Sequence, residues 1–220
     1  MPEGPPDFRS IGFFIRSVAI PAALHQRSLL ALRGSVIVRG QCAVVIIGPA
    51  GIGKTTAALF VCAQQDWRLV ADDVVVIQPM GDGRWSAPPG YGDTTVWPDA
   101  LRRLRLEPSE YVPVRRGVLK RHVPIGPFPP LNSAISRIYV YRSAVVPKPV
   151  VEPLDAFSGY RALSIRCGAC LPIAQMSCEA VFRQQLLTVS STVETRLLTR
   201  PRRGSSAQAT AEVLRNELPE

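Results

Sequence analysis

The sequence is poor in the residues that build disulfide and metal sites. It contains five cysteines and two histidines in 220 residues. The odd cysteine count gives no even disulfide framework, and Cys167 and Cys170 form a lone C-x-x-C pair. Neither His25 nor His122 lies at zinc-finger spacing from them. We therefore expect no disulfide scaffold and no structural zinc, and the unpaired thiols favour a reducing, cytoplasmic location.

Long apolar runs and a secretion signal are also missing. The N-terminus has no basic segment ahead of an apolar one. The early apolar run over residues 11–24 contains Arg16 and Pro21 and is too short to span a bilayer. We expect a soluble protein with no membrane partner.

The composition is globular and basic. Hydrophobic residues make up 46% and charged residues 20%, and the net charge is +9. A basic excess attracts anions of any kind, but no basic stripe with interleaved aromatics is present, so we do not expect nucleic acid as a partner. We expect residues 1–220 to form a single domain, with a loose leader over 1–10 and a C-terminal tail or helix over 199–220.

Apolar periodicity predicts an α/β protein. The run Cys42–Ile47 is continuously apolar and β-branched, which is typical of a central strand buried on both faces. An Ala-rich helix is predicted over 54–65, after a glycine-rich turn. Further strands are predicted over 13–24, 28–33, 35–39, 67–70, 74–77 and 135–141. Further helices are predicted from Trp97, over 178–187 and over 207–218, and 112–131 is expected to be irregular.

The turn after Ile47 carries the phosphate-binding pattern G-x-x-x-x-G-K-[ST]. Its glycines let successive backbone amides face phosphate oxygens, and the following helix adds the positive end of its dipole. Lys54 supplies a cation to the β- and γ-phosphates, and the Thr55 hydroxyl is a magnesium ligand. The predicted nucleotide-binding residues are Gly48, Pro49, Ala50, Gly51, Ile52, Gly53, Lys54, Thr55 and Thr56. ATP and Mg²⁺ are the expected cofactors.

A second element places two adjacent carboxylates, Asp72 and Asp73, at the end of the predicted strand 67–70. Adjacent acids repel each other unless a cation or proton is shared, and a magnesium nucleotide supplies that cation. One carboxylate can then join the metal shell while the other reaches an incoming hydroxyl, which phosphoryl transfer requires. The alternative is a solvated acidic turn.

The phosphate loop followed by Leu69-Val70-Ala71-Asp72-Asp73 resembles the catalytic domain of bacterial HPr kinase/phosphorylase, whose nucleotide site phosphoenolpyruvate carboxykinase shares. The resemblance implies a mixed, strongly twisted sheet with flanking helices, and a kinase acting on a serine of a peptide or small protein. A homo-oligomer is allowed, because larger family members form hexamers. We expect this chain to depart from those members, because we find in its sequence neither their second glycine-rich signature nor the separate N-terminal domain that they often carry.

The resemblance also implies residue roles. His25 matches a family histidine on a strand ahead of the phosphate loop, or is a structural histidine of an apolar strand. Asp72 would be the general base, with Asp73 and Thr55 on magnesium, or the two aspartates could exchange roles. The catalytic set implied is thus Asp72, Lys54 and His25.

The sequence is also similar to shorter relatives encoded beside peptide-tailoring genes, including those of lasso peptides. This likeness extends through residues 97–99, 119–121 and 200–202. Some of those relatives phosphorylate the C-terminal serine of a peptide. Lys120 and Arg121 are then candidates for contacts with the transferred phosphoryl group or the substrate carboxylate, or belong to a solvated basic loop.

Two other functions stay open. A generic P-loop ATPase or nucleotide-dependent regulator would share the loop, although neither an L-S-G-G-Q nor an N-K-x-D motif occurs. A small-molecule kinase would be expected to carry a lid with paired arginines, for which Arg102 and Arg103 are the candidates. Dependence of ATP consumption on a serine peptide separates these functions.

Overall fold

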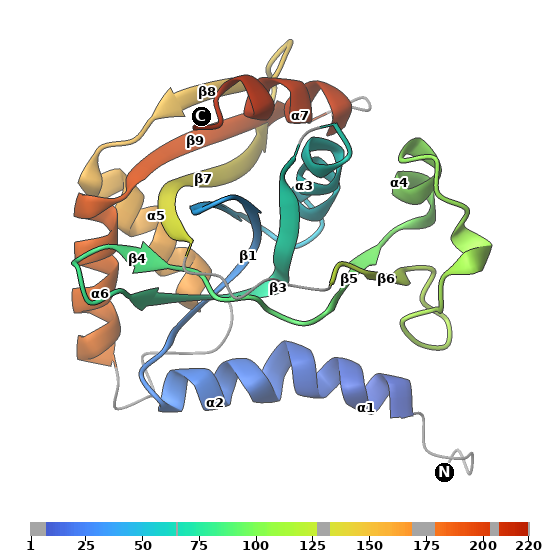
Figure 1. The fold of residues 1–220 in the computed structure, drawn as a ribbon, viewed down its shortest axis with the longest axis horizontal. Helices are drawn as coiled ribbons and strands as arrows, with labels where there is room; N and C mark the ends of the chain where they lie inside the picture. Colours follow the sequence, from blue (N-terminus) through green and yellow to red (C-terminus); the bar gives the residue numbers. More distant parts are fainter. Residues whose placement is uncertain (1–7, 65, 127–132, 169–178, 203–206, 220) are drawn as a thin grey trace.

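The computed structural model describes residues 8–64, 66–126, 133–168, 179–202 and 207–219. They contain nine strands and seven α-helices (Figure 1). The strands are β1 (Leu30–Arg39), β2 (Cys42–Ile47), β3 (Arg68–Pro79), β4 (Trp85–Ser86), β5 (Asp93–Val96), β6 (Arg121–Pro124), β7 (Ala134–Ala144), β8 (Val150–Pro153) and β9 (Glu194–Pro201). The helices are α1 (Phe8–Phe14), α2 (Ile20–Gln26), α3 (Lys54–Cys62), α4 (Pro98–Arg103), α5 (Ala156–Gly168), α6 (Glu179–Thr192) and α7 (Ala207–Asn216), with a π-helical segment η1 (Ile15–Ala19) and a 3₁₀ turn η2 (Pro108–Glu110).

Seven strands form one mixed sheet in the order β2-β1-β3-β4-β7-β9-β8. The pairs β2–β7 and β7–β9 are parallel and the others antiparallel. Because β2 also pairs with β7, the strands β2, β1, β3, β4 and β7 close into a ring. The predicted mixed sheet with flanking helices is therefore confirmed.

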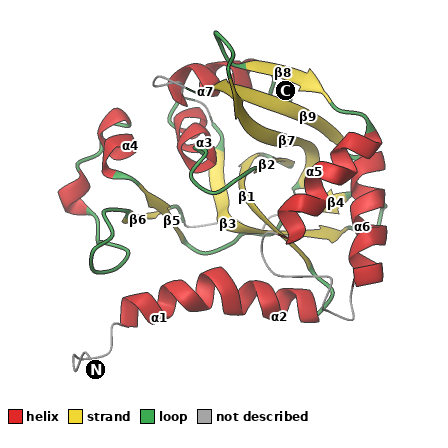
Figure 2. Ribbon diagram, turned by 180° about the vertical axis from the view of Figure 1, so that it is seen from behind, coloured by secondary structure: helices red, strands yellow, loops and turns green. Residues whose placement is uncertain are grey.

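Helices cover both faces of this sheet (Figures 1 and 2). On β2, Val44 and Ile46 belong to the core shared with α3 and α7, whereas Val45 and Ile47 belong to the core shared with α5 and α6. Alternate side chains of a strand point to opposite faces, so a strand covered on both sides needs apolar residues at every position. This explains the unbroken apolar run that predicted a central strand.

Two smaller parts lie beside the sheet. Strands β5 and β6 pair with each other and carry α4, forming a lobe next to α3 (Figure 1). The segment α1–η1–α2 forms one helical run along the outside of the molecule. None of the helices in the described part of the chain combines the length and apolar character that crossing a bilayer requires.

Several predicted elements are wrong. Residues 13–24 are helical rather than a strand, and the expected loose leader is helical from Phe8 onward, while residues 1–7 lie outside the described residues. The run pairs with no strand, so a helix satisfies its backbone internally. The two predicted strands on either side of Gly34 are one strand, β1. Gly34 lies within this strand and does not end it. It allows β1 to approach β2 closely, because a Cβ at this position would lie 2.9 Å from the Ile46 carbonyl oxygen.

The segments predicted as two strands around Asp72 and Asp73 also form one strand, β3, so the aspartates lie in mid-strand rather than at an end. Helix α3 ends three residues before the predicted limit, and β6 lies within a segment expected to be irregular. The helix predicted over 178–187 is α6, with Cys178 outside the described residues. Cys167 is fully buried in α5, and its C-x-x-C partner Cys170 lies outside the described residues.

Candidate active site

The phosphate loop joins β2 to α3, and each of its glycines stands where a side chain would be unfavourable. Gly51 and Gly53 have φ angles of 73° and 101°, a left-handed region that disfavours residues with a side chain. A Cβ at Gly48 would lie 2.7 Å from the carbonyl oxygen of Tyr141 on β7. The loop therefore curls tightly against β7 and delivers the chain to the first turn of α3, where unpaired amides face outward.

Lys54 begins α3 and is only 9% exposed. Its Nζ donates hydrogen bonds to the carbonyl oxygens of Gly48 and Pro49, at 3.1 and 3.0 Å. Burial lowers the pKa of Lys54, while the nearby Asp72 and Asp73 carboxylates act in the opposite direction. The ammonium group is thus held directly beneath the loop that it would serve.

Asp72 is the best-connected carboxylate of the site, although it is only 5% exposed. Its oxygens accept hydrogen bonds from the hydroxyls of Ser35 (2.6 Å), Thr55 (2.9 Å) and Thr94. Burial raises the pKa of Asp72, and the three hydroxyls, from Ser35, Thr94 and Thr55, only partly offset this. Asp72 therefore connects the end of the phosphate loop with strands β1 and β5.

Asp73 differs sharply from its neighbour. Its side chain is 47% exposed and forms an ion pair with Arg33 of β1, with Oδ1 2.5 Å from Nη1. Its φ is 68°, an uncommon value for a residue other than glycine, although aspartate tolerates it better than most. A register shift against β1 leaves Val70 as an extra residue just upstream. Bulges of this kind re-aim side chains beside active sites.

Two cavities lie close to this part of the structure. The smaller, of about 200 Å³, is lined by the phosphate loop and α3, from Gly51 to Thr56, and by Lys120. The larger, of about 410 Å³, is lined by Asp72 and Asp73 together with residues of α1, η1, β5 and β6. Thr95 lines both cavities. Asp72 and Asp73 line only the larger cavity, which we call the acceptor cavity. Asp72 is connected to the smaller cavity through its hydrogen bond from Thr55, which lines that cavity.

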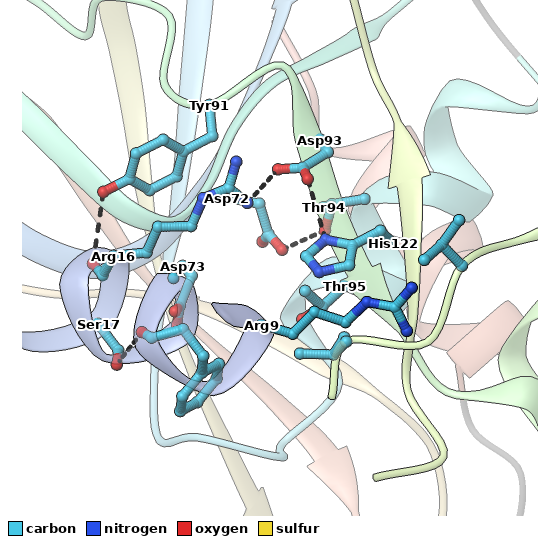
Figure 3. Close-up of a pocket in the computed structure, with 14 residues that line it drawn as sticks. Arg9, Arg16, Ser17, Asp72, Asp73, Tyr91, Asp93, Thr94, Thr95 and His122 are labelled. Atoms are coloured by element: carbon cyan, nitrogen blue, oxygen red, sulfur yellow. Dashed lines mark hydrogen bonds and ion pairs between the residues drawn. The ribbon is translucent and has the colours of Figure 1, made fainter. Parts of the chain in front are cut away.

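A second polar group lies across the acceptor cavity (Figure 3). Asp93 of β5 accepts a hydrogen bond from Arg16 of η1 at 2.5 Å, and its other oxygen lies 2.9 Å from His122 Nδ1 on β6. Arg16 also lies over the ring of Tyr91, with its Cζ 4.5 Å from the ring centroid. These contacts tie the N-terminal helical run to the β5–β6 lobe, so both walls of the cavity are fixed.

The predicted site residues do not all meet. His25 lies at the end of α2 rather than on a strand, fully buried, with its ring against Phe182 and its Nε2 donating to the Ala31 carbonyl. It lines neither cavity, so the structure favours the alternative of a structural histidine. Lys120 and Arg121 lie in different cavities. Lys120 lines the phosphate-loop cavity. Arg121 lines another cavity, and its Nε donates a hydrogen bond to the Pro108 carbonyl at 3.2 Å.

Several site residues were missed by sequence reasoning. Arg33 could have been found from the sequence, because it is a charged residue within a largely apolar strand. Thr94, Asp93 and His122 could not, since only the long-range contact of the β5–β6 lobe with β3 brings them to Asp72. Of the two arginines considered for a lid, Arg103 lines the phosphate-loop cavity and Arg102 does not.

The chain resembles known proteins only distantly in sequence. No family model matches the sequence, and no curated protein matches it. Among solved structures, the Hpr(Ser) kinase/phosphatase from Coxiella burnetii aligns over 85% of this chain and 89% of that chain, with 10% identity and a TM-score of 0.39. So distant a likeness says nothing about activity, and function has to be inferred from the site itself.

Proposed function

We propose that the chain is an ATP-dependent phosphotransferase that moves the γ-phosphoryl group to a serine hydroxyl of a peptide or small protein. One observation supports this most strongly. The hydroxyl of Thr55, at the start of the helix that follows the phosphate loop, donates to Asp72, and Asp72 also lines the adjoining acceptor cavity. A phosphate donor and an acceptor can therefore approach the same carboxylate from opposite sides.

The donor atoms fit a magnesium nucleotide. Magnesium prefers oxygen ligands and is held in phosphate-transfer sites by one or two carboxylates, a loop hydroxyl and the phosphates themselves. Thr55, Asp72 and Asp73 provide such oxygens, and no group of three or more His, Cys, Asp or Glu side chains with metal-binding geometry occurs among the described residues. Bound there, the ion would neutralise charge on the phosphates during transfer.

The contacts favour the exchanged assignment of the two aspartates. Asp72, which holds the loop hydroxyl, corresponds to the acid that shares magnesium with a P-loop threonine. Asp73 is the more exposed, and its ion pair with Arg33 fixes its orientation in the acceptor cavity. Asp73 would then accept the serine hydroxyl proton as the serine oxygen bonds to the γ-phosphorus and the bond from that phosphorus to the departing ADP oxygen breaks.

Lys54, the amides of residues 51–55 and Lys120 would bind the phosphates. Lys120 lines the same cavity as the loop, and its Nζ lies 5.6 Å from the centroid of the Trp97 ring. The acceptor cavity has a volume of about 410 Å³ and would receive the serine side chain. A peptide whose C-terminal residue is serine is one acceptor to test.

Incubation with ATP, magnesium and a library of serine peptides, followed by mass spectrometry, tests the proposal. We expect phosphopeptide from the wild type and none from Lys54→Met, whereas Lys148→Met, which alters an exposed lysine, keeps activity. ATP hydrolysis that is unchanged by every peptide would instead favour the generic ATPase.

A further inference from the structure

A cluster of arginines surrounds a third cavity, of about 620 Å³, beside the acceptor cavity. Four of its lining residues are Arg9, Arg115, Arg116 and Arg121, and none of the described residues that line it is acidic. Arg9, which Figure 3 shows among the residues of the acceptor cavity, also lines this cavity, so the two adjoin. We call it the arginine cavity.

The arginines are positioned by the fold rather than carried on a loose loop. The segment that bears Arg115, Arg116 and Arg121 folds back on itself: Val114 N donates to the Lys120 carbonyl at 3.0 Å, and Gly117 turns the chain at φ 76°. Arg115 lies over the ring of Phe13, its Cζ 5.4 Å from the centroid, which joins this turn to α1. The hydrogen bond from Arg121 Nε to Pro108 fixes a further guanidinium.

Positive charge that is gathered with no carboxylate among the described lining residues favours the binding of an anion. Guanidinium groups pair with carboxylates through two parallel hydrogen bonds, and such charge-assisted bonds are stronger than neutral ones. The rim is also apolar, because Phe8 and Leu119 are 76% and 65% exposed and line the same cavity. The chemistry therefore suits an anionic ligand that carries apolar groups.

We propose that the arginine cavity binds side-chain carboxylates of acidic residues near the acceptor serine, so that the substrate is an acidic peptide segment. This inference rests on the proposed function for the statement that the peptide is the phosphate acceptor. The three guanidiniums of Arg115, Arg116 and Arg121 exceed what one terminal carboxylate can pair with, which favours several acidic side chains as the source of the charge.

The neighbouring acceptor cavity argues against nucleic acid as the ligand. It is lined by Asp72, Asp73 and Asp93. A nucleic acid carries a phosphate at every nucleotide and would place negative charge against these carboxylates. A peptide can present a neutral serine there and confine its acids to the arginine cavity.

Fluorescence anisotropy tests this with labelled, C-terminally amidated peptides that contain one serine flanked by glutamates or, in the matched peptide, by glutamines. We expect the glutamate peptide to bind wild-type protein at least about tenfold more tightly. The double variant Arg115→Glu/Arg116→Glu should lose that preference. The matched control Arg102→Glu/Arg161→Glu changes two exposed arginines outside the cavity by the same charge and should keep it. Arg116→Glu alone, at an exposed turn position, covers the case in which the double variant misfolds.

Three results would overturn the inference: equal binding of the glutamate and glutamine peptides, an equal loss in the double variant and its control, or tighter binding of single-stranded RNA of the same charge. A requirement for a free C-terminal carboxylate instead of glutamates would also overturn it. Binding is measured without nucleotide, so it is independent of transfer. If the glutamate peptide binds but is never phosphorylated, only the proposed function fails, and if the glutamine peptide is phosphorylated equally well, only this inference fails.

Discussion

Replacing Asp72 with asparagine should make the protein more stable and less active. Asp72 is 5% exposed, and its charge is stabilised by three hydroxyl donors, each contributing about 1.5–3 kcal/mol to a charged acceptor. Burial nevertheless outweighs them, because the pKa of Asp72 is raised rather than lowered. The carboxylate is thus held in an unfavourable environment, as expected for a group kept for function.

Asparagine keeps the shape and one acceptor oxygen but removes the charge. We expect the free energy of unfolding at pH 7.5 to rise by about 1–2 kcal/mol, or roughly 2–8 °C in the midpoint for a chain of this length. A raised pKa means that the folded protein binds the proton more tightly than the unfolded chain, so wild type gains stability as the pH falls. The difference between the two proteins should therefore shrink toward about pH 4. Phosphoryl transfer should fall on the order of 100-fold or more.

Urea unfolding at several pH values and peptide phosphorylation measure the two effects. Asp73→Asn is the matched control for stability: its exposed ion pair contributes only about 0–1 kcal/mol, and asparagine tolerates the left-handed backbone. A fall in stability for Asp72→Asn at neutral pH would refute the view that burial dominates. Full transfer activity would refute its place at the reacting phosphates.

Three further predictions concern local features. Gly48→Ala should destabilise the protein by about 1–3 kcal/mol, because the added Cβ would lie 2.7 Å from the Tyr141 carbonyl oxygen. Gly81→Ala is the control and should leave the stability unchanged, because no atom lies within 4 Å of the added Cβ. Thermal unfolding compares the two variants. Burial lowers the pKa of His25, although its hydrogen bond to a backbone carbonyl acts in the opposite direction. The unfolded chain therefore takes up the proton first, and the folded protein loses stability as the pH falls below about 6.5. His25→Gln should reduce this loss when the free energy of unfolding is compared at pH 5.5 and 7.5, and an unchanged pH dependence would contradict the prediction. Asp73→Ala should cost about 1–2 kcal/mol more than Asp73→Asn, because alanine at φ 68° lacks a side chain that hydrogen-bonds locally; equal midpoints would show that the backbone relaxes.

The local part of the site could be predicted from the sequence. The phosphate loop is recognised from residues that are neighbours along the chain: spaced glycines, an apolar strand before them and a helix after them. The structure has this order in β2, the loop and α3. The pair Asp72 and Asp73 is likewise predicted from the sequence, because the two residues are adjacent in it. Their different surroundings, one buried among hydroxyls and one paired with Arg33, depend on which strands flank β3.

The rest depends on contacts between distant segments. An apolar run such as 13–24 satisfies either a strand or a helix until its surroundings are known, and here it has no strand to pair with. The β5–β6 lobe brings Thr94 to Asp72 and His122 to Asp93, and no spacing in the sequence encodes either approach. The placement of His25 on a strand relied on order along the chain, whereas the residue lies at the end of α2 with its ring against Phe182.

A crystal structure with magnesium and a non-hydrolysable ATP analogue tests the central claim most directly. We predict that the phosphates contact the backbone amides of residues 51–55 and Lys54, and that the ion contacts the Thr55 hydroxyl with Asp72 in its coordination shell. An analogue bound away from this loop, or an ion with neither Thr55 nor Asp72 near it, would contradict the account.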